Sequence, residues 1–95
     1  MDYKFAVSVS TDKDTGRTLG VYFQIREGKA ARVTELQEGS AFANYDSKGH
    51  LLGIEIIAPC KFTVLERITR QEPKKKQADM RKFLRNSSPR AMVAV

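Results

Sequence analysis

The strongest constraint on the fold is a change in hydrophobic periodicity at Pro59. Before it, apolar residues recur at every second position, which is typical of half-buried strands. After it, they recur at helical spacing, as in Phe62, Leu65 and Ile68. Proline cannot donate a hydrogen bond to a strand ladder, so the sheet is expected to stop there. The sequence therefore predicts an α+β fold: an antiparallel β-meander of about five strands followed by one or two C-terminal α-helices.

Five segments carry the strand pattern, and polar turns separate them. They span residues 3–9, 19–25, 31–36, 41–45 and 50–57. In the first, the alternation predicts one half-buried face made by Tyr3, Phe5, Val7 and Val9. The clearest turn runs from Asp46 to Gly49, because aspartate can bond its own backbone and glycine takes a left-handed exit. The last segment is apolar on both faces, with Leu51 facing away from Leu52, Ile54 and Ile56, and is expected to be the most central strand. The facing of residues 41–45 stays open.

Helical signals follow Pro59. Thr63-x-x-Glu66 is a candidate capping box for a first short helix that Pro73 ends. A second helix is predicted over residues 75–85, with an apolar stripe of Met80, Phe83 and Leu84. Residues 90–95 are expected to be a frayed end. We therefore divide the chain into a β-meander domain, residues 1–58, and a basic helical C-terminal extension, residues 59–95, packing on the same core.

The charge of the chain is concentrated in that extension. The net charge is +6, yet residues 1–60 hold seven Lys or Arg against eight Asp or Glu, whereas residues 61–95 hold ten against three. Such density can neutralise phosphates, so nucleic-acid association is an alternative function, set against a merely solvated helix. The candidate contact residues are Arg67, Arg70, Lys74, Lys75, Lys76, Arg81, Lys82 and Arg85.

No constellation in the chain favours catalysis. The only histidine, His50, and the only cysteine, Cys60, flank one strand, which when extended separates them by about 30 Å. The Asp12-x-Asp14-x-Gly16 stretch resembles the start of a calcium loop but lacks the later ligands. Of four glutamates that could line an acidic face, at most two are expected to be neighbours; they are Glu27, Glu35, Glu38 and Glu55. We therefore predict no enzyme, no catalytic residues, no cofactor and no metal.

Size and composition favour a cytoplasmic homo-oligomer. No segment approaches the roughly 20 apolar residues of a spanning helix, and the first residues lack the pattern of a secretory signal. A single cysteine suits a reducing compartment. A sheet of about sixty residues has difficulty covering both of its faces, and its hairpins leave open edges, so self-association is expected. The function predicted from the residues is thus a non-enzymatic protein-protein interaction module.

Three stretches of residues 3–58 carry a family resemblance. They are Val21-Tyr22-Phe23-Gln24-Ile25, Glu27-Gly28-Lys29-Ala30-Ala31-Arg32 and the hairpin from Asn44 to Ile56, with its Tyr-Asp-x-x-Gly-x-x-x-Gly-Ile-Glu-Ile pattern. Together they resemble the bacterial domain-of-unknown-function family twenty-two eighty-three. The resemblance implies a small β-rich fold in a bacterial protein, with no catalytic residues to transfer, and an antitoxin-like role with a protein partner. The loop at residues 12–16 and the helical extension depart from that family by their length.

Overall fold

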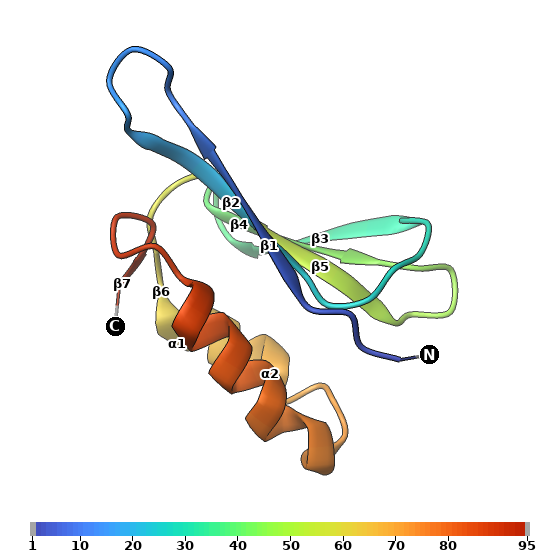
Figure 1. Ribbon diagram of the computed structural model, residues 1–95. Helices are drawn as coiled ribbons and strands as arrows, with labels where there is room; N and C mark the ends of the chain where they lie inside the picture. The colour runs from blue at the N-terminus through green and yellow to red at the C-terminus, as the bar shows by residue number, and fades with distance from the viewer. Residues whose placement is uncertain (1, 95) are drawn as a thin grey trace.

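The structure, a computed structural model, describes residues 2–94 and contains one five-stranded antiparallel sheet followed by two helices. The strands are β1 (Ala6–Thr11), β2 (Thr18–Gln24), β3 (Arg32–Gln37), β4 (Ala41–Tyr45) and β5 (Leu51–Ile56). A two-residue strand β6 (Cys60–Lys61) leads into α1 (Phe62–Thr69), and α2 (Lys74–Ser87) is followed by β7 (Val93–Ala94). Both helices lie on one side of the sheet (Figure 1). The α+β class and the five antiparallel strands are confirmed.

The strand order differs from that of the predicted five-stranded meander. The sheet runs β1-β2-β5-β4-β3, so β2 pairs with β5 instead of with β3. Only β3, β4 and β5 form a meander. The physical reason lies in composition: β5 is almost entirely buried and gains most from the centre, as expected, whereas β3 carries Arg32 and Glu35 and suits an edge. The Asp46–Gly49 turn forms as predicted, with Gly49 at a φ of 86°.

The core lies between the sheet and the helices. From β2 it takes Val21 and Phe23, with Ile25 just beyond the strand, and β4 presents Ala41, Ala43 and Tyr45 to the same side. That settles the facing of residues 41–45. The expected stripe of α2 is confirmed, because Met80 and Leu84 are fully buried and Phe83 packs partly against the core.

Four local predictions are wrong. Where Asn44 pairs with Gly53 but Tyr45 pairs with Leu51, β5 holds one extra residue, so Leu51 joins the core despite its alternation. No side chain caps α1, which starts at Phe62, so the Thr63 capping box does not form; Pro73 is the N-cap of α2 and does not end α1. The expected frayed end is ordered up to Ala94, because β7 pairs in parallel with β6 and buries Met92 and Val93.

Candidate functional site

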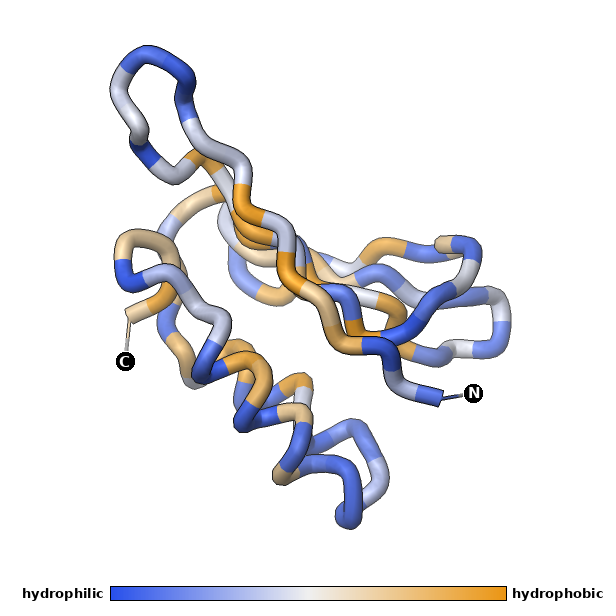
Figure 2. Tube along the Cα trace, viewed as in Figure 1, coloured by the Kyte–Doolittle hydropathy of each residue, from blue (hydrophilic) through white to orange (hydrophobic). Residues whose placement is uncertain are grey.

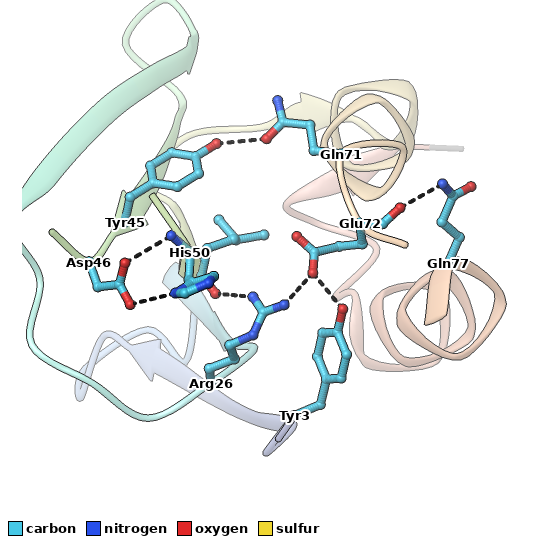
Figure 3. A network of polar contacts seen from close by, with 9 residues as sticks. Tyr3, Arg26, Tyr45, Asp46, His50, Gln71, Glu72 and Gln77 are labelled. Carbon is cyan, nitrogen blue, oxygen red and sulfur yellow. Dashed lines mark hydrogen bonds and ion pairs between the residues drawn. The ribbon is translucent and has the colours of Figure 1, made fainter. Parts of the chain in front are cut away.

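A buried polar cluster joins the sheet to the turn between the helices. The Arg26 guanidinium donates through Nη2 to Glu72 Oε1 at 2.5 Å and through Nη1 to the carbonyl of Leu51 at 2.7 Å. The Tyr3 hydroxyl donates to the same Glu72 oxygen, and its ring lies 4.4 Å from the Arg26 guanidinium carbon. Figure 3 shows these side chains converging from the N-terminal segment, the end of β2 and the interhelical turn.

Burial makes the ion pair in this cluster costly to break. The Arg26 and Glu72 side chains are only 8% and 7% exposed, and Arg26 Nε has no hydrogen-bond partner among the described residues. Burial and the hydrogen bond to the Glu72 carboxylate raise the pKa of the Tyr3 phenol to about 12. A buried pair of this kind is costly to break from one side, because the remaining charge is left unpaired. We therefore assign the cluster to holding the helices on the sheet.

Sequence reasoning missed this cluster for a definable reason. Regular alternation along β2 turns Ile25 inward and Arg26 outward. In the structure, the backbone N–H groups of Ile25 and Arg26 both donate to the carbonyl of Leu52, which marks a bulge. The bulge turns Arg26 toward the helices. The only available signal was an arginine at the end of an apolar strand and a glutamate beside Pro73.

His50 and Cys60, the two residues considered for catalysis, lie in different surroundings. His50 lies before β5, 46% exposed, and its Nδ1 lies 3.1 Å from Asp46 Oδ2. Backbone donation from His50 is the main cause that holds the pKa of Asp46 below its usual value. Cys60 is buried, and that burial raises its thiol pKa. Within residues 2–94, no group of three or more His, Cys, Asp or Glu side chains could hold a metal ion.

The two acidic features form ordinary local structure. Asp12 Oδ1 accepts hydrogen bonds from the backbone N–H groups of Asp14 and Thr15, so the first hairpin loop is an aspartate turn. Of the four candidate glutamates, Glu35 and Glu55 both flank Phe42 on the sheet face away from the helices.

The basic residues spread over both helices and the turn between them. Arg67 is exposed on α1 and Arg70 at its C-cap, and Lys74, Lys75 and Lys76 form the first turn of α2, which holds no acidic residue. Lys82 and Arg85 are exposed further along α2, and Arg81 is partly buried. Two of the eight lie over aromatic rings: Lys76 over Tyr3 at 5.7 Å and Arg85 over Phe62 at 5.0 Å. None forms an ion pair with another described residue.

The most unusual surface is the outer part of the β1–β2 hairpin, which extends beyond the helices (Figure 1). All six residues of β1 are exposed. Val7 and Val9 pair with the core residues Phe23 and Val21, so they face the helix side, yet they are 42% and 48% exposed. Leu19, the extra residue of β2 in this ladder, is 54% exposed. Figure 2 shows apolar residues along this hairpin up to its hydrophilic loop.

The opposite face of the sheet carries both polar and apolar side chains, among them Val33, which is 61% exposed. The Tyr22 side chain crosses Gly53 so closely that a Cβ there would lie 2.0 Å from its hydroxyl oxygen. Beside it, a depression of about 280 Å³ is lined by polar residues, Ser8, Ser10 and Glu55, and by apolar ones that include Leu19 and Ile57. Among residues 2–94, no hydrogen bond joins Ser8 or Ser10 to the Glu55 carboxylate.

Comparison with known proteins gives no relative: no family model, no curated protein and no solved structure matches this chain. Among the helices of residues 2–94, none has the length and apolar character needed to cross a bilayer.

Proposed function

We propose that this protein is a non-enzymatic interaction module that associates with itself. The observation that carries the proposal is β1, an edge strand that exposes all six of its residues and contains no charged side chain. Such edges are templates for pairing with another strand, and proteins that stay monomeric usually block them with charges, proline or bulges. The different surroundings of the only histidine, in an exposed turn, and the only cysteine, in the core, support the non-enzymatic part.

Sedimentation velocity over a micromolar concentration range tests the proposal. We expect a species of twice the 10.7 kDa chain mass whose fraction grows with concentration. A single 10.7 kDa species across that range would overturn self-association. An antitoxin-like role in a bacterial cytoplasm, suggested by the family resemblance, would add a heterologous protein partner to the same module.

A second candidate function, nucleic-acid association, rests on the first turn of α2. Lys74, Lys75 and Lys76 stand there without an acidic neighbour in that turn, where the positive end of the helix dipole disfavours cations. A bound phosphate would relieve this repulsion. Lys75→Glu with Lys82→Glu reverses two exposed charges without touching the core, and Lys29→Glu with Lys48→Glu is the matched control outside the helices.

Gel shifts with unrelated duplexes at about 50 mM and about 200 mM salt separate the two functions. Nucleic-acid association predicts binding that weakens at the higher salt concentration and is lost in the helix variant but kept in the control. Absence of binding by the wild type at the lower salt concentration would remove this candidate.

A further inference from the structure

We propose that a second copy of this chain docks on the outer edge of β1 as an antiparallel strand, with Ser8 of each copy at a two-fold axis. This inference rests on the proposed self-association and specifies its interface. The argument uses the direction of the free backbone groups, the charges that flank the strand and the position of the exposed valines.

The backbone of β1 limits which residues can pair. The N–H groups of Lys4 and Asp12 donate to the carbonyls of Ile25 and Arg17, so the even-numbered residues between them face β2. The odd-numbered residues therefore direct their N–H and C=O groups toward the free edge. An added antiparallel strand must pair odd residues with odd residues. With Ser8 on the axis, Val7 faces Val9 of the second copy, and the two residues exchange both N–H···O bonds.

Charge selects this register from its neighbours. Residues 6–11 carry no charge, so self-pairing brings no like charges together. With Ser8 on the axis, Lys4 lies opposite Asp12 of the second copy, on the sheet face away from the helices, and symmetry repeats the pair. Moving the axis by one residue to Val7 or Val9 places Lys4 opposite an uncharged serine or the Asp14 turn. The centred register alone matches both charges.

Both charged groups are available for the new contact. Lys4 forms an ion pair with Glu27 at 2.6 Å, but both side chains are about two-thirds exposed, and such pairs are weak. Asp12 uses Oδ1 for its turn, and no hydrogen bond among the described residues uses its Oδ2.

The same register covers the exposed valines. Val7 and Val9 of both copies meet on the helix side of the joined sheet, and Val9 of the second copy also lies diagonal to Phe5. Phe5 already stacks on Phe83 of α2 with ring centroids 4.7 Å apart. The new valine cluster therefore continues the existing core instead of forming an isolated contact.

The other edge of the sheet is a poorer partner. β3 carries Arg32 and Glu35, and its pairing with β4 is irregular between Glu35 and Gln37. Charges and bulges at an edge are the features that block strand addition.

Disulfide trapping of the full chain tests the register. In the proposed dimer, the two Ser8 Cα atoms face each other in a non-hydrogen-bonded pair about 4.5 Å apart, within disulfide range. Ser8→Cys should therefore cross-link under mild oxidation. Ser10→Cys is the matched control, because its two copies lie about 13 Å apart along the strands. Wild type reports on the buried Cys60, which should not cross-link.

A mixture of two cysteine variants tests the same register at a position away from the two-fold axis, in case the geometry at the axis prevents a disulfide. Ala6 lies opposite Ser10 of the second copy, so Ala6→Cys mixed with Ser10→Cys should give a mixed disulfide, and neither variant alone should give one. Failure of both Ser8→Cys and the mixture in a protein that sediments as a dimer would overturn this interface and leave self-association standing. If the Ser10→Cys variant cross-links in the absence of the Ala6→Cys variant, the proposed register is wrong. A monomer by sedimentation would overturn both proposals.

Discussion

The first predicted apolar face consists of two halves with the same alternating pattern, but the helices cover only one of them. Tyr3 and Phe5 are partly buried against the helices, Tyr3 through Glu72 and Phe5 through Phe83, whereas Val7 and Val9 remain exposed. Alternation determines which side of a sheet a residue faces, but the length and position of the covering helices determine what is buried. The difference separates residues that stabilise the single chain from residues that remain free for another chain.

The largest expected effect is at the buried half. Glu72→Ala removes the carboxylate that binds both Arg26 and Tyr3 and leaves a buried arginine unpaired. We expect a loss of about 3–5 kcal/mol in the free energy of unfolding, measured by urea denaturation. Replacing both partners, Arg26→Met with Glu72→Leu, should cost less than the single change. Equal losses in the two variants would show that packing, not the unpaired charge, dominates.

A matched pair of truncations tests the comparison directly. Phe5→Ala removes the ring stacked on Phe83 and should lower the free energy of unfolding by about 1–2 kcal/mol, since Phe5 is only partly buried. Val9→Ala should change the stability of the isolated monomer by less than about 0.5 kcal/mol. Thermal melts at concentrations where each variant is monomeric would check this. A larger loss for Val9→Ala would reverse the assignment of the two halves.

A smaller effect concerns alkaline pH. The Tyr3 phenol has a pKa of about 12 in the folded state against 10.0 for the free group, so folding favours the protonated form. Its contribution is fully present below pH 10 and is lost as the pH rises toward 12. Tyr3→Phe should cost about 1 kcal/mol at neutral pH through the lost hydrogen bond. It should also show a weaker decline in stability between pH 10 and 12 than wild type. Parallel declines would remove Tyr3 as the cause.

The smallest expected effect is on association alone. Lys4→Glu places a carboxylate opposite Asp12 of the second copy, and symmetry counts the change twice. We expect about fivefold weaker dimerisation by sedimentation equilibrium. Lys29→Glu, an equal change of charge in an exposed connection, is the control and should leave dimerisation unchanged. An equal effect of both variants would indicate a response to net charge, with no specific pair.

Much of the fold could be predicted from local patterns, and the errors in strand pairing share a cause. The alternating segments, the central position of β5 and the stripe of α2 all depend on residues near one another in sequence. The pairing of β2 with β5, the bulge that turns Arg26 inward and the β6–β7 pair depend on distant contacts. Their local sequences, such as the two residues Cys60 and Lys61, carry no periodicity that could reveal them.

The two candidate surfaces, the basic residues and β1, also differ in how much of each could be predicted from the sequence. The eight basic residues and their division between two helices could be predicted from the sequence, but the placement of Lys76 and Arg85 over aromatic rings could not. The exposure of β1 could not be predicted either, because Val7 and Val9 follow the pattern of a buried face. Self-association and nucleic-acid binding remain predictions that the experiments above test, and the absence of catalysis remains a prediction.

In the sequence, β3 and β4 separate β2 from β5, the strand with which β2 pairs. This separation affects the rate of folding. The β1–β2 hairpin, the β3–β4–β5 meander and the two helices each form from contacts close in sequence, whereas joining β2 to β5 first requires closing the chain between Gln24 and Gly53. Long closures slow folding, because their entropy is lost before the contacts form. We therefore expect the β2–β5 seam to form in the rate-limiting step. Gly53→Ala, which forces Tyr22 away from that seam, should slow refolding more than it speeds unfolding.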